Sequence, residues 1–508
     1  MIWLLTALGA LVAVVLYDVT QKHHAILRNF PIIGHFRYWL EAIGPELRQY
    51  IVTSNDEELP FSRDQRRWVY ASAKEENNYS GFGSDNALET SPNYLIIKHA
   101  TLGLPDDPPH DDLWSLPAAK IMGGHRRRQH AFRPASVVNV SGMSFGSLSS
   151  AAVEAINRGC RISGCLHNTG EGGISPYHLH GGELTWQIGT GYFGARAPDG
   201  GFDLELCARK VEEHPVRAIE LKLSQGAKPG LGGVLPGAKV TREIAKIRGV
   251  PVGETVISPS GHRAFSNVDE MLDVVETLAE RTGRPVGIKS AVGEIEFWEE
   301  LADRMSREDR GVDFITIDGG EGGTGAGPFV FSDHVALPFK MGFSRVYRVF
   351  AERGVHEKVV WIGSGKLGFP ETALTAFALG ADIVNVGREA MLAIGCIQAQ
   401  RCHTGHCPTG VATQNRWLVR GLDPTDKGAR LANYVIMLRK ELIRLTRACG
   451  VAHPALLSAD QIEILDENFG SRTLREVFGY TAGWEFPGAH DRAAILDLID
   501  GRSRVRAS

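Results

Sequence analysis

Short runs of β-branched and apolar residues alternate with stretches of helical periodicity from about residue 137 onward. The amphipathic segments 267–283 and 370–380 each end in a glycine, which is a common helix stop signal. Polar and glycine-rich turns follow most of the apolar runs. The predicted strands cover residues 136–142, 165–170, 218–224, 254–259, 285–291, 313–319, 359–365 and 382–388.

Eight strand–helix units within about 260 residues have the size and rhythm of a (β/α)8 TIM barrel, which is an α/β fold. A doubly wound open sheet is the competing architecture, but it usually has fewer strands and a GxGxxG turn after the first one. No such turn follows the first predicted strand. The interval after the second strand holds residues 187–196, which we interpret as a small hairpin insertion, and a helix over 204–213.

The N-terminal segment carries a different pattern, because residues 2–17 are apolar and uncharged. Lysine, histidine and arginine follow this stretch and none precedes it, which predicts a single membrane anchor with the rest of the chain in the cytoplasm. A cleaved signal peptide is the alternative. A second apolar patch, residues 30–43, contains Pro31 and charged residues, and indicates an interfacial or packed helix. The basic run 125–130 is either a solvated face or a docking site for an acidic partner.

Composition narrows the class of protein. The 508 residues are 43% hydrophobic and 22% charged, which is typical of a globular chain. The net charge of −4 argues against a general nucleic-acid binder. Seven cysteines are an odd number, and four of them lie in apolar or helical surroundings as expected for reduced core thiols.

Active sites of such barrels lie at the C-terminal ends of the strands, which we call the barrel mouth. The last two predicted strands end in GSGK (363–366) and GR (387–388), where Lys366 or Arg388 could hold a phosphate. The sixth ends in DGGEGGTGAGP (318–328), a glycine density that suits a flat ring or phosphate against the main chain. These features favour a mononucleotide such as FMN. The alternatives are ordinary tight turns and a flexible surface loop.

The third predicted strand runs into KLSQGAKPGLGG (222–233), which offers Lys222, Gln225 and Lys228. Two cations and an amide at a barrel mouth suit a dicarboxylate substrate, although exposed loop lysines are the simpler interpretation. Lys289 ends the fifth predicted strand and points to the same mouth. Glu171, after the second strand, is either a proton donor, an orienter of a nitrogen group, or a charge at a helix N-terminus.

Three cysteines, Cys396, Cys402 and Cys407, fall within CIQAQRCHTGHCPTG (396–410). The spacing allows idle thiols, a zinc site completed by His403 or His406, or an iron–sulfur cluster. The loop follows the last strand and a short helix, so it returns to the rim where the phosphate turns are predicted.

Five motifs in order resemble the synthase domain of glutamate synthase, and the match covers residues 137–415: VSGMSFGSLS, HNTGEGG, IELKLSQGAKPGLGGVLPG, DGGEGGTGAGP and GCIQAQRCHTGHCPTGVATQ. The resemblance implies an FMN barrel that reduces 2-iminoglutarate, formed from 2-oxoglutarate and ammonia, to L-glutamate. It implies a [3Fe–4S] cluster on Cys396, Cys402 and Cys407 that supplies electrons to FMN.

The resemblance also assigns roles at the mouth. It gives Glu171, Lys222, Gln225 and Lys228 to 2-oxoglutarate or ammonia, and places Lys289 near the flavin. The predicted cofactor-binding residues are Met143, Ser144, Thr169, Lys289, Gly322, Gly323, Gly363, Ser364, Gly365, Gly387 and Arg388. The predicted domains are an N-terminal transmembrane anchor (1–24), a lead-in packing on the barrel (25–135), the FMN-binding barrel with its iron–sulfur loop (136–415) and a helical C-terminal extension (416–508).

The chain departs from that family on its N-terminal side, because it begins Met1-Ile2-Trp3 and has no cysteine before Cys160 to serve a glutaminase domain. We therefore expect nitrogen as free ammonia, from a separate glutaminase subunit, or as another amine. Ferredoxin or a separate reductase is the expected electron donor. The whole pattern resembles the stand-alone FMN-binding members of the family, single-pass in the cytoplasmic membrane.

Three other functions stay open. A related branch makes N-methylglutamate from methylamine and glutamate. A membrane-tethered redox relay without turnover would need the cysteines but not Lys222, Gln225 and Lys228. A 2-hydroxyacid oxidase would need no cysteine cluster, and its S-x-H-G-x-R motif is not found at the final strands.

Overall fold

The computed structural model describes residues 2–21, 23–105, 111–468 and 470–506. The chain forms two compact units, residues 1–67 and 68–508, and each is described by itself. The first unit consists mainly of helices. They are α1 (Ile2–Thr20), α2 (Ala25–Asn29), α3 (Ile33–Leu47), one π-helical turn (Arg48–Val52) and the start of α4 (Arg63–Ala73).

Helix α1 is long and apolar enough to cross a membrane, by length and composition, a property that signal sequences near an N-terminus share. A polar contact ties its end to the start of α3. The Asp18 carboxylate accepts the Ile32 N–H over 3.0 Å and lies 2.9 Å from Nε2 of His35. This contact links the end of α1 to the start of α3 within the first unit.

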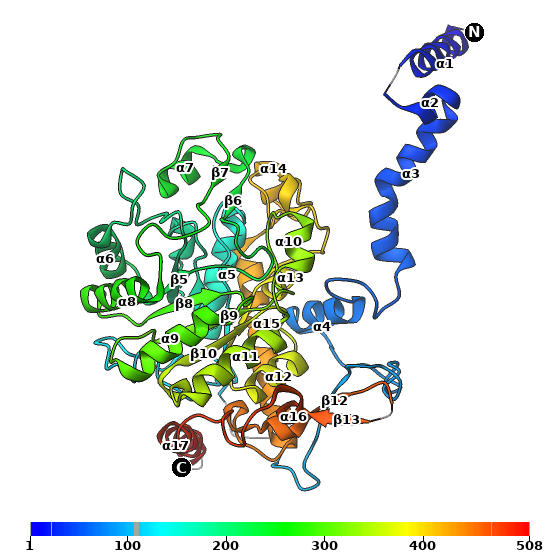
Figure 1. Cartoon of the computed structure of the whole chain (residues 1–508). Coiled ribbons are helices and arrows are strands. Elements are labelled where there is room, and N and C mark those ends of the chain that lie inside the picture. Colours follow the sequence, from blue (N-terminus) through cyan, green and yellow to red (C-terminus); the bar gives the residue numbers. More distant parts are fainter. Residues whose placement is uncertain (1, 22, 106–110, 469, 507–508) are drawn as a thin grey trace. The chain divides into compact units, whose positions relative to one another are not determined.

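The second unit is built around a closed barrel of eight parallel strands (Figure 1). Its strands follow each other round the barrel in chain order, and β11 closes onto β2 by pairing Val384 with Val138. The predicted TIM barrel is therefore confirmed. The strands are β2 (Val138–Val140), β3 (His167–Asn168), β4 (Leu184–Ile188), β5 (Val216–Lys222), β8 (Val286–Ser290), β9 (Phe314–Asp318), β10 (Val360–Ser364) and β11 (Ile383–Val386).

Two predictions about the strands are wrong. Residues 187–196 do not form a hairpin insertion, because barrel strand β4 begins before them and includes Gln187. Residues 254–259 contain β7 (Val256–Ile257), which pairs with β6 (Val234–Leu235) in a small sheet outside the barrel. The β-branched residues of β7 suit any strand, but Ile257 is 71% exposed, which no buried barrel strand would allow.

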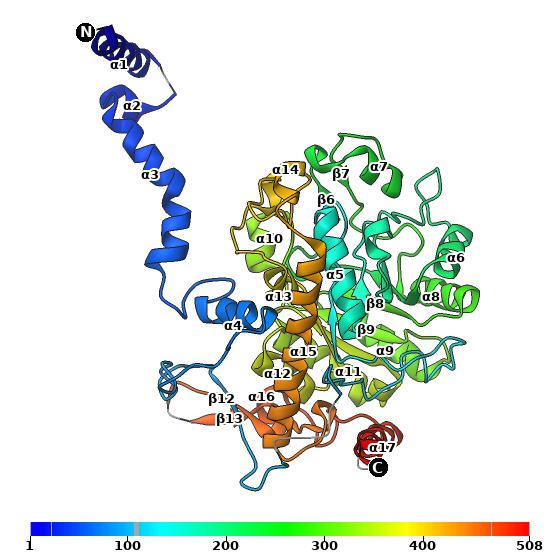
Figure 2. The same ribbon diagram turned by 180° about the vertical axis from the view of Figure 1, so that it is seen from behind.

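Helices surround the barrel on the outside, and both ribbon views show this arrangement (Figures 1 and 2). The predicted stop glycine after α8 is confirmed, since Gly283 adopts the left-handed φ of +66° that ends a helix. The helices are α5 (Ser150–Ser163), α6 (Leu204–Glu213), α7 (Arg242–Arg248), α8 (Val268–Thr282), α9 (Glu296–Arg307), α10 (Phe329–His334), α11 (Phe339–Glu352), α12 (Pro370–Ala378), α13 (Arg388–Ala393), α14 (Arg416–Val419) and α15 (Pro424–Ala448).

Helices α5 and α15 cross at two glycines. A Cβ on Gly159 would lie 2.7 Å from Cβ of Leu431, and a Cβ on Gly428 would lie 2.9 Å from Cβ of Arg158. Only residues without side chains allow this close approach. The long helix α15 is thereby held against the barrel wall next to β2, as the predicted helical extension requires.

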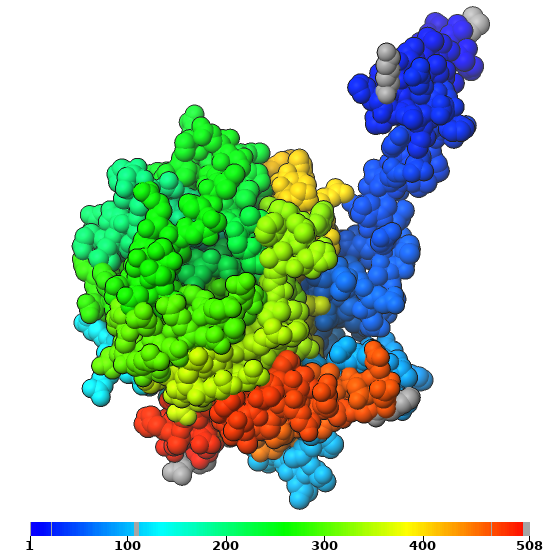
Figure 3. Space-filling view, viewed as in Figure 1, coloured from blue at the N-terminus to red at the C-terminus, as the bar shows by residue number. Residues whose placement is uncertain are grey.

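The C-terminal extension also contains strands, which the prediction lacked. Strands β12 (Ile462–Leu465) and β13 (Ser471–Thr473) form an antiparallel sheet with β1 (Leu95–Ile97). Helices α16 (Leu474–Phe478) and α17 (Ala489–Arg506) complete the extension. The Tyr480 ring stacks on Tyr347 of α11 with centroids 5.7 Å apart, so the red and orange segments lie along the yellow-green one (Figure 3).

The bottom of the barrel is closed by the segment that precedes β2. Met122 and Phe132 pack in one buried cluster with Phe314, Val360 and Ile383, which lie at the N-terminal ends of their strands. A barrel plugged at its bottom leaves the opposite end, the mouth, as the place for a ligand.

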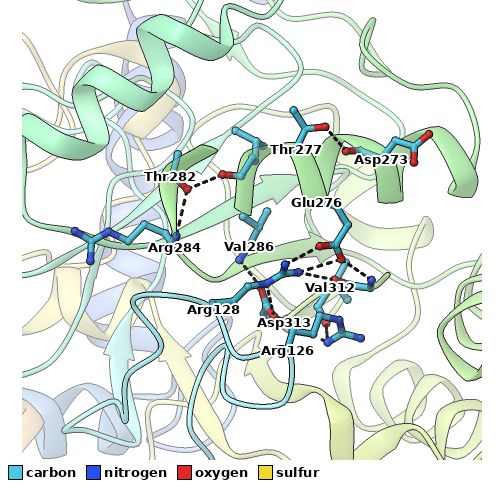
Figure 4. A network of polar contacts seen from close by, with 12 residues as sticks. Arg126, Arg128, Asp273, Glu276, Thr277, Thr282, Arg284, Val286, Val312 and Asp313 are labelled. Carbon is cyan, nitrogen blue, oxygen red and sulfur yellow. Dashed lines mark hydrogen bonds and ion pairs between the residues drawn. The ribbon is translucent and has the colours of Figure 1, made fainter. Parts of the chain in front are cut away.

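The basic run 125–130 contributes to this closure, so neither predicted role fits its two inward arginines (Figure 4). Nε of Arg128 lies 3.0 Å from the Asp313 carboxylate, and Nη1 donates to Glu276 over 2.6 Å. Arg126 donates to the Val312 carbonyl over 2.9 Å. These contacts fix the start of β9, whereas the neighbouring Arg127 is exposed.

Candidate active site at the barrel mouth

The predicted substrate residues come together at the mouth. Nζ of Lys222, the last residue of β5, lies 2.9 Å from Oε1 of Glu171 and 2.6 Å from Oε1 of Gln225. Lys228 reaches across to the loop after β9 and donates to the Ala326 carbonyl over 2.9 Å. These four side chains thus form one polar set at the mouth: Glu171, Lys222, Gln225 and Lys228.

The electrostatics of this set keep Glu171 ionised. Burial by itself would raise the pKa of the Glu171 carboxyl, but the charges of Lys222, Lys228 and Arg248 together lower it below its usual value. Burial lowers the pKa of Lys228, and repulsion from Lys222 adds to the shift. The mouth therefore holds more positive than negative charge close to Glu171.

Sequence reasoning missed two members of this set, Arg248 and His262. Arg248 ends α7, and its guanidinium donates to the Phe145 carbonyl over 3.1 Å and to the Ser144 hydroxyl over 3.3 Å. Burial lowers the pKa of Arg248 to about 10, which the Glu171 charge opposes. No local motif surrounds Arg248 in the sequence, so only the folded loop reveals it.

His262 supports the Lys222 backbone. Its Nε2 lies 2.9 Å from the Lys222 carbonyl, which can only accept, so this nitrogen carries the proton. Its Nδ1 lies 3.2 Å from the Tyr192 hydroxyl. Burial lowers the pKa of His262, which favours this neutral form. The motif ISPSGH around it carried no chemistry that the sequence could identify.

Beneath the mouth, the barrel interior carries a buried carboxylate that the sequence reasoning also missed. Glu220 of β5 is 1% exposed and accepts hydrogen bonds from Asn168 (2.8 Å), Gln187 (2.6 Å) and Thr316 (2.7 Å). A small cavity next to it has space for about one water molecule. The period-two position of Glu220, two residues before Lys222, was the available signal.

Several predicted flavin residues lie along the same rim. Nζ of Lys289 is 3.6 Å from the Asp318 carboxylate and 3.5 Å from the Ser141 hydroxyl. Asp318 in turn accepts the Gly226 N–H over 2.8 Å. Gly365 has a φ of +119°, and a Cβ there would lie 3.0 Å from the Gly319 nitrogen. The loops after β5, β9 and β10 therefore meet through backbone.

The two cations predicted for phosphate also lie together. Burial and the neighbouring Arg388 lower the pKa of Lys366. The Arg388 guanidinium donates to the Glu321 carbonyl, and a Cβ on Gly323 would lie 2.7 Å from Cδ of Arg388. Gly322 belongs to the same loop, and Gly387 precedes α13. Two partly buried cations next to a glycine loop fit the phosphate of a mononucleotide.

The remaining predicted cofactor residues are Met143, Ser144, Thr169, Gly363 and Ser364. Gly170 has a φ of +65°, and its missing Cβ leaves room for the Ser144 nitrogen, so Met143 and Ser144 lie against the loop after β3. The Thr169 hydroxyl accepts the Gln187 N–H over 3.1 Å. A Cβ on Gly363 would meet Leu367 and Phe339, so the main chain of Gly363 and Ser364 is close-packed there.

The three cysteines lie on the loop after α13. Cys396 and Cys402 are partly exposed and Cys407 is buried. The Gln398 N–H donates to Sγ of Cys396 over 3.4 Å. Among the residues that the structure describes, no group of three or more histidine, cysteine or acidic side chains is arranged to hold a metal ion. That finding supports neither the zinc alternative nor a preformed cluster site.

The surroundings of Cys407 suit a thiolate, whereas those of Cys402 by themselves favour the neutral thiol. Burial would raise the pKa of Cys407, but hydrogen bonds from the Ala412 and Thr409 N–H groups outweigh it and lower the pKa. Burial and the nearby Cys407 raise the pKa of Cys402. Hydrogen bonds to sulfur are characteristic of iron–sulfur ligands. The donor chemistry of this loop therefore fits such a cluster.

Comparison with known proteins identifies the family. Residues 119–452 match the family described as "Conserved region in glutamate synthase". The glutamate synthase large subunit-like protein YerD of Bacillus subtilis is 39% identical over 481 residues, which cover 88% of this chain and 90% of that protein. The archaeal glutamate synthase (NADPH) of Methanocaldococcus jannaschii is 34% identical over 68% of this chain and 65% of its own length.

Among solved structures, a mutant flavocytochrome b2 with benzoylformate is similar at a TM-score of 0.46 and 13% identity, covering 84% of this chain and 92% of that one. The family is identified by the sequence relatives and not by the flavocytochrome b2 structure. The match over 119–452 includes the barrel, the mouth residues and the cysteine loop. The chain belongs to the glutamate synthase family.

Proposed function

We propose that this protein is an FMN-dependent glutamate synthase that reduces 2-iminoglutarate, formed from 2-oxoglutarate and ammonia, to L-glutamate. The cationic set around Glu171 carries the proposal, because three positive side chains at one mouth suit a dicarboxylate. Family membership supports it, and relatives are named archaeal glutamate synthase (NADPH).

The reaction balances as two steps. Ammonia and 2-oxoglutarate lose water to give the imine, and two electrons and two protons then convert the imine to the amine. Bound FMN would supply the hydride, with Lys366 and Arg388 on its phosphate and Lys289 and Asp318 near its ring. The electrons would come from ferredoxin or a separate reductase.

The protein's own residues would bind and orient the substrate. Lys228 and Lys222 would hold the carboxylates, and Gln225 would add an amide contact. The ionised Glu171 would hold the ammonium or imine nitrogen, since an anion beside that nitrogen stabilises its positive charge. Ammonia would arrive free or from a separate glutaminase subunit.

Replacement of Lys228 by methionine tests the substrate assignment. Loss of one charge-assisted hydrogen bond should raise KM for 2-oxoglutarate about tenfold or more. FMN content should stay at one per chain. Lys246→Met, at an exposed position of α7, is the matched control and should leave KM unchanged. An unchanged KM in Lys228→Met would show that Lys228 does not bind the substrate.

We also propose that Cys396, Cys402 and Cys407 hold a [3Fe–4S] cluster. Hydrogen bonds from peptide N–H groups to Cys396 and Cys407 support this, as does the position of the loop beside the mouth.

Replacement of Cys402 by serine should remove the cluster absorbance and the bound iron while FMN remains. Iron, sulfide and FMN contents per chain are the measurements, on anaerobically purified protein. Cys449→Ser alters a buried thiol outside the loop and should keep the cluster. Full cluster absorbance in Cys402→Ser would overturn the ligand assignment.

The first unit, we propose, anchors the protein to the cytoplasmic membrane through α1, with the barrel in the cytoplasm. Side chains along α1 are exposed and apolar, and Phe36 and Trp39 of α3 are exposed at 60% and 56%. Aromatic residues of this kind favour the membrane interface.

Centrifugation tests the anchor. The full chain should sediment with membranes after a carbonate wash, and Leu8→Lys should shift it to the supernatant, because a lysine in the span costs about 3 kcal/mol. Exposed Lys246→Met should still sediment. Recovery of a mature chain that lacks residues 1–24 would support a signal peptide and contradict the anchor.

A further inference from the structure

A buried lysine outside the substrate set, Lys239, connects the cysteine loop to the loop after β2. Lys239 ends a short 3-10 turn (Gly237–Lys239) and is 5% exposed. Its Nζ donates to the carbonyl of Cys402 over 2.8 Å, to that of Ala412 over 3.1 Å and to that of Ser147 over 3.5 Å. Residues more than 150 positions apart in sequence thus share one ammonium group.

The number of acceptors indicates that the group is charged. An ammonium carries three N–H donors, whereas a neutral amine has only two, and three carbonyl oxygens surround Nζ. Burial of a charge is costly unless its donors are satisfied. The contacts of Lys239 provide that compensation.

Two of the acceptors belong to residues next to the thiols. Cys402 offers its own carbonyl, while Ala412 bonds Lys239 through its carbonyl and the Cys407 sulfur through its N–H. Lys239 thus contacts both arms of the loop that carries two of the predicted cluster ligands.

The third acceptor belongs to the flavin side. Ser147 follows the predicted cofactor residue Ser144, and their hydroxyls are 3.1 Å apart. Nε2 of Gln414 makes a second connection, to the carbonyls of Gly146 (3.2 Å) and Leu148 (2.9 Å). Two polar side chains therefore hold the cysteine loop against the loop after β2.

We propose that Lys239 is a positioning residue that fixes the cysteine loop to the loop after β2 and places a positive charge beside the cluster, which raises the cluster's reduction potential. The proposal rests on the cluster and flavin of the proposed function. Reduction adds one electron, and a fixed cation beside the cluster stabilises the more negative, reduced form. Lys239 is not among the residues that we assign to the substrate or to the flavin.

Three variants separate charge from packing. Lys239→Met keeps most of the side-chain volume without charge, and Lys239→Arg keeps the charge with a different shape. Lys246→Met on the exposed surface of α7 is the matched control. For each full-length chain, iron and FMN contents are measured first, and the cluster midpoint potential is then obtained by redox titration followed by electron paramagnetic resonance.

Lys239→Met should retain FMN and show either a more negative cluster potential or a loss of iron, which are the consequences of lost charge and lost anchoring. Lys239→Arg should remain closer to the wild-type potential than Lys239→Met, and Lys246→Met should match wild type. Full iron content with an unchanged potential in Lys239→Met would overturn the proposal. Wild-type protein with FMN but no iron would refute the cluster itself, and the role of Lys239 with it.

Discussion

The excess of positive charge at the barrel mouth is the constraint on which the rest of the site depends. Lys222, Lys228 and Arg248 act on one carboxylate, Glu171, and their combined charge outweighs the burial that would otherwise protonate it. A Cβ on Gly233 would lie 2.5 Å from Oε1 of Glu171, so the glycine at this position leaves room for the carboxylate. The proposed anionic substrate would need this excess of positive charge, and its nitrogen would need the one negative group.

The polar interior of the barrel supports that arrangement. Interior layers of such barrels are usually filled by branched apolar side chains, yet here Glu220 takes three hydrogen bonds from neighbouring strands. Lys222 follows two residues later on the same strand and faces the same interior. Donors from β3, β4 and β9 hold β5 in register, so the lysine at its end is presented in a fixed position. A preorganised cation needs little rearrangement when a carboxylate binds.

Much of the fold could be predicted from the local pattern of hydrophobic and polar residues, because barrel strands alternate with helices at regular spacing. The sequence did not predict strand β4, because Thr185 and Gln187 interrupt its apolar pattern and belong to the polar interior of the barrel. Residues 254–259 were wrongly predicted as a barrel strand, because β-branched content does not distinguish a barrel strand from a strand of a small sheet outside the barrel. Motifs pointed to the proposed substrate residues, since each lies at or just after the end of a strand. Arg248 and Lys239 lie on the long segment between β5 and β8. Their hydrogen-bond partners are distant in sequence, so only the fold could reveal the roles of these two residues.

Anaerobic re-oxidation of the reduced protein tests the central claim most directly. The flavin is reduced photochemically, and its absorbance is followed after addition of 2-oxoglutarate with ammonia, or of each alone. The account predicts that the flavin re-oxidises only with both, with one L-glutamate formed per flavin oxidised. No re-oxidation with both, or turnover with methylamine and glutamate in their place, would contradict it.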